Sequence, residues 1–175
     1  FSKYNSIAVD LAENLYAELD KIVYKFSPDG GVTQYGTTSF SSSAMRPGPG
    51  GQLYIQKRDN PDFFAIPAGG GEAVKIGRIK SRVSFFDIDT EGYLYSGGSA
   101  NGLYVTKPDF TVSAEFPGYK NAWAIKAVRV FNGFLYVAAD TILKVPDYHY
   151  SRIWKHELKG AGQLGERIDV LKWAN

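Results

Sequence analysis

The chain of 175 residues contains no cysteine. Disulfide bonds, zinc–thiolate sites and thiol chemistry within the chain are therefore excluded, although the compartment is left open. No apolar run approaches the ~20 residues that a membrane-spanning helix needs. The net charge is only +2 and the basic residues are spread along the chain, so the sequence gives no electrostatic footprint for nucleic acid.

Signatures of catalysis are also scarce. The only histidines are His149 and His156, which do not favour a zinc site in a chain without cysteine. Counting residues does not exclude a Ser–His–Asp triad, but no Gly-x-Ser-x-Gly elbow is present. The segment 87–92 begins like a calcium loop and lacks the glutamate at its twelfth position, so it predicts a hairpin turn.

What the sequence has is a repeat. The pair Leu-Tyr recurs at intervals of 38, 41 and 41 residues, each time within a longer similar pattern. A period near forty residues, made of short strand-like runs and turns, is typical of a β-propeller with one four-stranded blade per repeat. The pairs are Leu15-Tyr16, Leu53-Tyr54, Leu94-Tyr95 and Leu135-Tyr136. The sequence therefore predicts an all-β propeller.

Runs of alternating or apolar residues predict the strands of each blade. The first blade is expected at 6–10, 15–19, 22–26 and 32–35, and the third at 83–88, 93–96, 102–106 and 112–116. The fourth is expected at 125–130, 134–138, 141–145 and 152–156, with a tight hairpin at Asn132-Gly133. In the second blade, prolines in residues 45–51 predict an irregular innermost strand or loop, after a Ser-rich connection at 37–43.

The ends of the chain suggest further blades. Residues 1–6 resemble 116–121, which join one blade to the next, and 167–171 reads as another first strand. We expect blades at 5–38, 39–82, 83–121 and 122–165, with 166–175 starting a further one. Four full blades with partial flanking blades predict an arc of a larger ring of five to eight blades, excised, processed or part of a longer protein. A closed four-bladed ring is the alternative.

Residues 6–30 resemble the NHL-type propeller repeat, which runs from a strand through Leu-Tyr to a Pro/Asp-Gly turn. Residues 128–145 are similar, and Asp87-x-Asp89 fits the turn before Leu94, whereas the second blade departs from the pattern. Families of this kind include protein-binding modules, extracellular and virion structural proteins, and gluconolactonase-like hydrolases. Such hydrolases hold one divalent cation in the central channel, with Glu, Asn and Asp ligands from different blades. The resemblance therefore implies a candidate cation site of this kind.

Polar side chains follow the second strand of every predicted blade. Because equivalent loops of a propeller lie on one rim, these oxygens could converge on Ca²⁺ or another divalent cation. Asp and Asn are also favoured in such turns for local hydrogen bonding alone, which is the simpler interpretation. The candidate metal ligands are Glu18, Asp20, Asp59, Asn60, Asn101 and Asp140, with Ser99 beside them.

The repeated leucine is expected in the core, and the repeated tyrosine on the neighbouring blade with its hydroxyl reaching a partner. Trp123 and Trp154 are expected to pack between blades, with stacking on a sugar as the alternative. We expect a non-enzymatic scaffold with no catalytic residue and no cofactor. Its partner would be a protein or the remaining blades, in an oligomer or larger assembly, extracellular or virion-associated rather than cytoplasmic. The alternative is a metal-dependent lactonase or esterase using Glu18, Asn60, Asn101 and Asp140.

Overall fold

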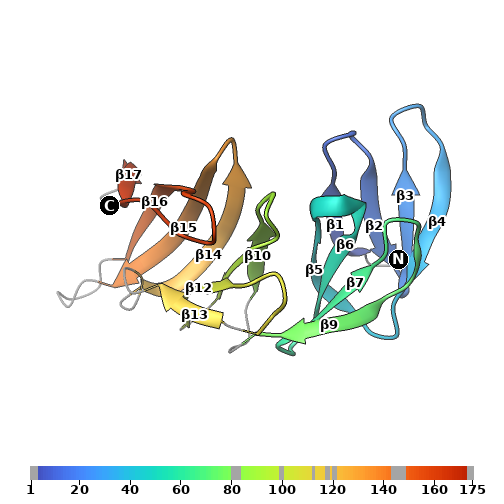
Figure 1. Cartoon of the computed structure of the whole chain (residues 1–175), viewed down its shortest axis with the longest axis horizontal. Helices are drawn as coiled ribbons and strands as arrows, with labels where there is room; N and C mark the ends of the chain where they lie inside the picture. Colours follow the sequence, from blue (N-terminus) through green and yellow to red (C-terminus); the bar gives the residue numbers. More distant parts are fainter. Residues whose placement is uncertain are drawn as a thin grey trace. The chain divides into compact units, whose positions relative to one another are not determined.

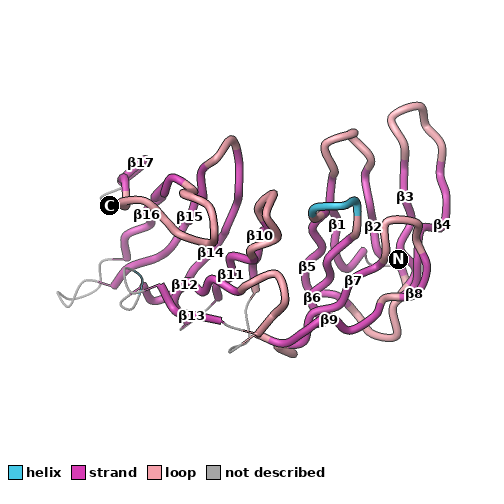
Figure 2. The backbone as a smooth tube through the Cα atoms, in the orientation of Figure 1, coloured by secondary structure: helices cyan, strands magenta, loops and turns pink. Residues whose placement is uncertain are grey.

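The computed structural model describes residues 4–79, 84–98, 101–111, 113–116, 119, 122–142 and 149–172. Strands dominate this part of the chain, which also includes the short 3-10 turn Pro49–Gly51 (Figure 2). The chain divides into two compact units, residues 1–82 and 83–175, and each unit contains two sheets. The prediction of an all-β propeller is confirmed. No helix in the described ranges is long and apolar enough to cross a membrane.

The first blade is an antiparallel meander, ordered β1-β2-β3-β4 (Figure 1). Its strands are β1 (Tyr4–Val9), β2 (Leu15–Leu19), β3 (Ile22–Phe26) and β4 (Val32–Thr37). Asp20 and Lys21 join β2 to β3 with positive φ angles of 51° and 68°, as in a two-residue hairpin turn that matches the strand twist. The short strand β8 (Gly71–Glu72) pairs with β4 in parallel, so two residues expected in the second blade join the first.

The second blade is ordered β5-β6-β7-β9. Its strands are β5 (Ser42–Pro47), β6 (Leu53–Lys57), β7 (Asp62–Ile66) and β9 (Val74–Arg78). The expected irregular innermost strand is a true strand with a bulge between Ser42 and Ala44. The prolines are tolerated because Pro47 ends β5 and Pro49 starts the 3-10 turn, where a missing N–H costs little. The Ser-rich connection is correspondingly shorter than expected.

The second unit holds the third and fourth blades, ordered β10-β11-β12-β13 and β14-β15-β16-β17. The third comprises β10 (Phe85–Ile88), β11 (Leu94–Gly98), β12 (Asn101–Thr106) and β13 (Ser113–Phe116). The fourth comprises β14 (Ala122–Phe131), β15 (Phe134–Ile142), β16 (His149–Glu157) and β17 (Ile168–Lys172). Asn132 and Gly133 both have positive φ between the paired Phe131 and Phe134, which confirms the predicted hairpin.

The strand order of the fourth blade corrects three expectations. The second strand continues to Ile142, so no separate strand starts at Thr141. The run containing Arg152 is part of β16, the third strand and not the outermost one. The segment expected to begin a further blade is β17, which pairs with β16 and completes the fourth sheet. Residues 143–148 lie outside the described part.

The first and third blades share a turn that holds the repeated tyrosine. Asp10 Oδ1 accepts hydrogen bonds from the backbone N–H groups of Ala12 and Asn14, and the Tyr16 hydroxyl donates to its Oδ2 at 3.0 Å. Asp89 is used in the same way in the third blade, where the Tyr95 hydroxyl donates at 2.9 Å. In the first and third blades the predicted hydroxyl partner is therefore an aspartate six residues earlier. In the second blade that position is Gly48, and the Tyr54 ring occupies the space that its side chain would need.

The two halves of the Leu-Tyr pair face opposite ways. Leu53 of the second blade clusters with Tyr16 of the first, and Leu135 of the fourth blade clusters with Tyr95 of the third. Within each unit, the leucine of the second sheet thus faces the preceding blade and the tyrosine of the first sheet faces the following one. The Leu53 and Leu135 side chains are fully buried, and burial of this kind stabilises by about 1.5–3 kcal/mol per residue. Trp154 belongs to the buried cluster that contains Tyr95 and Leu135, as expected. The side chain of Trp123 lies outside the described part.

Candidate functional site

Glu18, the first predicted metal ligand, lies inside β2 and not in the loop after it. Its side chain is fully buried and accepts a 3.1 Å hydrogen bond from the backbone N–H of Ser42, as well as one from the Ser42 hydroxyl. The guanidinium of Arg58 donates to the Ser42 carbonyl at 3.2 Å. Glu18 therefore joins the first blade to the first strand of the second.

The other predicted ligands of the first unit occupy turns. Asp20 and Asp59 are exposed and have positive φ angles, a conformation that Asp tolerates better than most residues. Asn60 Oδ1 accepts a 2.9 Å hydrogen bond from the backbone N–H of Asp62, which closes a local turn. These contacts agree with the simpler, turn-forming interpretation of all three residues.

The remaining ligands belong to the second unit. Asn101 begins β12 and pairs with Gly98, and Ser99 lies outside the described residues. Asp140 forms an ion pair with Lys126 at 3.2 Å, and the Ser151 hydroxyl donates to it at 2.9 Å. In the described ranges, no three His, Cys, Asp or Glu side chains come together around one point. A cation site built from residues of both units remains a prediction.

Asp140 lines a cavity of about 210 Å³ on one face of the fourth blade. Ala138 and Asp140 lie on the same face of β15 because side chains alternate along a strand, and they pair with Ile153 and Ser151 of β16. Lys126, Asp140 and Ser151 make up one polar wall, and Leu171 closes the apolar side. The full lining is Lys126, Ala138, Ala139, Asp140, Ser151, Arg152, Ile153 and Leu171.

Sequence reasoning missed Lys126, Ser151 and Arg152. The Ser151 contact depends on the cross-strand pairing of β15 with β16, which no local motif records. The Nε of Arg152 is buried and has no hydrogen-bond acceptor among the described residues. Arg152 pairs with Ala139, so its side chain lies on the face of β16 opposite to Ser151 and Ile153.

The cavity belongs to a larger face that no blade of its own unit covers. Tyr136 lies on this face of β15, and its ring packs beside Phe134 at a centroid distance of 6.4 Å. Lys155 of β16 lies over the Phe134 ring at 4.9 Å, and Leu171 of β17 is 40% exposed. We call this surface the trailing face; it comprises Lys126, Phe134, Tyr136, Ala138, Asp140, Ser151, Ile153, Lys155 and Leu171.

The first blade also has a face that no blade of its own unit covers. This face is on the leucine side of its sheet, whereas the trailing face is on the tyrosine side. Ile7 of β1 pairs with Ala17 of β2, and Val9 pairs with Leu15, on the side of the sheet that faces away from the second blade. Ile7 and Val9 are 60% and 58% exposed. We call this surface the leading face; it comprises Ile7, Val9, Leu15, Ala17, Tyr24, Phe26 and Val32.

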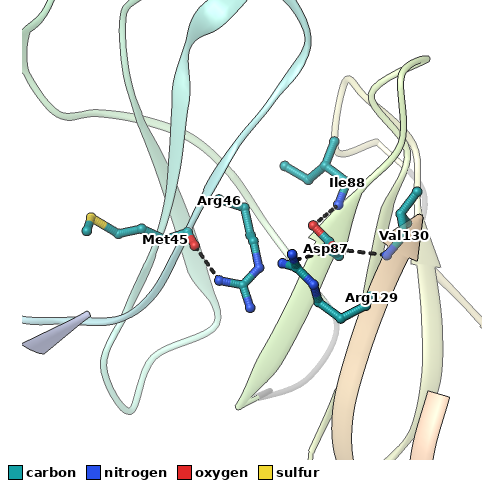
Figure 3. Close-up of polar contacts among 6 residues, drawn as sticks. All are labelled: Met45, Arg46, Asp87, Ile88, Arg129 and Val130. Atoms are coloured by element: carbon teal, nitrogen blue, oxygen red, sulfur yellow. Dashed lines mark hydrogen bonds and ion pairs between the residues drawn. The ribbon is translucent and has the colours of Figure 1, made fainter. Parts of the chain in front are cut away.

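Buried polar groups elsewhere in the second unit join its two blades. Asp87 of β10 accepts a 2.8 Å hydrogen bond from the Val130 N–H of β14 and pairs with Arg129 at 3.5 Å (Figure 3). His156, expected in an outermost strand, is fully buried on β16 between Tyr119 and Gly165. Neither group lines the cavity.

No protein-family model and no curated protein sequence matches the chain. The fold is similar to several solved β-propellers. Hydrazine synthase of Kuenenia stuttgartiensis shares 14% identity at a TM-score of 0.69, over 96% of this chain and 54% of that one. Virginiamycin B lyase of Staphylococcus aureus shares 10% identity at 0.59, over 95% and 70%. A putative gluconolactonase shares 13% identity at 0.61, over 93% and 60%.

These likenesses define the class of protein as a β-propeller, and at such low identities they show the fold alone. The chain spans about half of the hydrazine synthase chain, 70% of the virginiamycin B lyase chain and 60% of the gluconolactonase chain. A computationally designed protein, Ika4, is matched over 91% of its length at a TM-score of 0.57 and 10% identity.

Proposed function

We propose that this chain is a non-enzymatic propeller module that acts by assembly, binding further propeller-type sheets through its leading and trailing faces. The observation that carries the proposal is a difference in exposure between equivalent residues. Ile7, Met45 and Val128 each pair with the residue that follows the repeated tyrosine of their own blade. Met45 is 0% exposed and Val128 is 1% exposed, whereas Ile7 is 60% exposed.

Covering Ile7 would have a substantial effect on association. Full burial of an isoleucine side chain is worth about 1.5–3 kcal/mol, and Val9 and Val32 lie on the same face. Contiguous apolar patches of this kind on soluble proteins are usually interaction sites or aggregation liabilities. The partner expected from the repeat is another propeller blade, because that is what covers the equivalent residues within each unit.

The lengths of the similar structures support the same idea. The chain corresponds to 54–70% of the natural propellers described above. We propose that its four blades form an arc of a ring of five to eight blades, the size range usual for propellers. Blades that complete such a ring would cover the leading and trailing faces.

Sedimentation velocity tests the assembly function. The wild-type chain is expected to form a species larger than 19.3 kDa that dissociates on dilution. Ile7→Arg should abolish that species because it places a charge in the contact. Leu11→Arg is the matched control, since Leu11 is fully exposed in the turn between β1 and β2 and away from the sheet face. A wild-type chain that sediments as a monomer at all concentrations would contradict the proposal.

A metal-dependent hydrolase is the second candidate. It is favoured by the cavity, where Asp140, Lys126 and Ser151 lie together, and by the likeness to a putative gluconolactonase. Against it, Glu18 and Asn60 already accept hydrogen bonds from nearby backbone N–H groups. The two candidates differ in the response of their melting temperature to calcium.

A further inference from the structure

Two blade–blade contacts within the units use equivalent positions. Glu18 and Gly97 each lie two residues after the repeated tyrosine of their own blade. Glu18 contacts Ser42 of the second blade, and a β-carbon placed on Gly97 would lie 2.7 Å from Cβ of Ile125 of the fourth blade. Both contacts therefore join the middle of the second strand to the first strand of the next blade.

The receiving residues are equivalent as well. Ser42 pairs with Lys57 and Ile125 pairs with Ala139, and each of these partners is the third residue after the tyrosine of its own blade. The units thus repeat one docking rule, in which a fixed position of β2 or β11 faces a fixed position of β5 or β14. A rule that holds for two pairs of blades also identifies the positions at the two ends of the chain.

At the trailing face the equivalent of Glu18 and Gly97 is Ala138. It lies on the cavity of about 210 Å³, and its partner position in a next blade is not occupied by its own unit. At the leading face the equivalent of Ser42 and Ile125 is Tyr4, which pairs with Leu19, the third residue after Tyr16. One chain therefore carries both halves of the contact, one at each end.

We propose that the trailing face of one copy of this chain binds the leading face of a second copy, with strand β1 of the second copy entering the cavity beside Ala138. The inference rests on the proposed assembly function and names its partner. The contact is head-to-tail, because the two faces differ. Two copies related in this way supply eight blades, which is within the usual size of a closed propeller.

The polar wall of the cavity fits a strand as its occupant. In the first unit, the carboxylate of Glu18 accepts the backbone N–H of the incoming strand at Ser42. At the trailing face a carboxylate is again present in Asp140, which already pairs with Lys126 and accepts from the Ser151 hydroxyl. An incoming strand offers backbone N–H groups, so it would donate to this carboxylate as the Ser42 N–H donates to Glu18.

Paired cysteines test the geometry, and a chain with no cysteine of its own is well suited to them. Two single variants, Tyr4→Cys and Ala138→Cys, are purified with tags of different size, mixed and oxidised. A disulfide-linked heterodimer is expected, and neither variant alone should link to itself. Val74→Cys replaces Tyr4→Cys in the control, because Val74 is 55% exposed on β9, outside both faces. Linking of Ala138→Cys to Val74→Cys at the same yield would overturn the inference.

Complementation provides a second measurement that does not depend on disulfide geometry. Ile7→Arg and Ala138→Arg should each be monomeric alone. Every head-to-tail contact between two copies of the same variant would include one damaged face. Mixed together they should associate, because the intact trailing face of the first meets the intact leading face of the second. If the wild type assembles but the mixture stays monomeric, the head-to-tail arrangement is wrong and the assembly function stands. If the wild type itself never assembles, the proposed function fails first.

Discussion

The hydroxyl of Tyr95 donates a 2.9 Å hydrogen bond to Oδ2 of Asp89, which lies six residues earlier in the chain. Oδ1 of the same aspartate accepts the backbone N–H groups of Glu91 and Tyr93. Burial, together with the charge of Asp89, raises the pKa of Tyr95, so the phenol stays protonated and remains a donor. One carboxylate therefore holds the turn between β10 and β11 and fixes the repeated tyrosine.

The first prediction concerns this hydrogen bond. Tyr95→Phe should lower the free energy of unfolding by about 1.5–3 kcal/mol, because a donor to a charged acceptor is lost. Tyr54→Phe is the control, since the Tyr54 hydroxyl accepts only from the neutral side chain of Gln52 and should cost about 0.5–1.5 kcal/mol. Urea unfolding measures both, and equal losses would contradict a special role for the aspartate.

The second prediction concerns the contact between the third and fourth blades. Gly97→Ala should destabilise the chain by about 1–3 kcal/mol, because the new methyl group would overlap the Ile125 side chain in a packed interior. Gly69→Ala meets no atom within 4 Å, and it should be neutral or stabilising by up to about 1 kcal/mol. If alanine is tolerated equally at both positions, Gly97 is not at a tight blade contact.

The third prediction concerns pH. His156 Nδ1 donates to the Gly165 carbonyl at 3.0 Å, so in the neutral ring Nε2 accepts from the Tyr119 hydroxyl at 2.8 Å. Burial lowers the pKa of His156, and the nearby Arg167 charge adds to the decrease, while the Gly165 hydrogen bond opposes it. The unfolded chain then binds a proton at the ordinary pKa of 6.5 that the folded chain resists.

The stabilisation by neutral His156 is therefore complete above that pKa and is lost as the pH falls below it, with a slope of at most about 1.4 kcal/mol per pH unit. His156→Gln should be less stable at neutral pH and should lose less stability on acidification to pH about 5.5, above the usual carboxylate range. Both proteins contain His149, so its contribution to the pH dependence is the same in both. Parallel curves of unfolding free energy against pH for the two proteins would be the contrary result.

The fourth prediction separates the two candidate functions. Under the assembly proposal, millimolar calcium chloride should leave the melting temperature unchanged, and gluconolactone should not be hydrolysed. A cation that used Asp140 as a ligand would raise the melting temperature by binding the folded state. That rise should then vanish in Asp140→Ala and persist in Asp109→Ala, whose carboxylate only closes an exposed turn with Thr111. Such a pattern, with hydrolysis, would favour the enzyme.

Much of the fold could be predicted because its information is local and periodic. The Leu-Tyr pair marks a strand with one side chain on each face, and Asn132-Gly133 fixes a hairpin. The fourth blade was harder, because the sequence does not say where β15 ends or that β17, after a connection of ten residues, returns to β16. Strand-forming segments have similar sequence patterns, and only their pairing decides which segment is the third strand of the sheet and which is the fourth.

The candidate site was less accessible to sequence reasoning for the same reason. Glu18 was predicted as a rim ligand because a carboxylate near a turn is a common metal ligand, whereas its partner Ser42 lies 24 residues along the chain. Alternation does place Glu18 on the same face as Tyr16, and that was the available sign of a blade contact. The pairing of Asp140 with Ser151, and so the cavity wall, had no such sign.

The central claim is that the exposed faces of the first and fourth blades bind other propeller blades. Light scattering coupled to size-exclusion chromatography, over a range of concentrations of the untagged chain, tests it most directly. We predict a molar mass of twice 19.3 kDa at high concentration, falling to the monomer on dilution and in Ile7→Arg. A mass of 19.3 kDa at every concentration, identical for the wild type and Ile7→Arg, would contradict it.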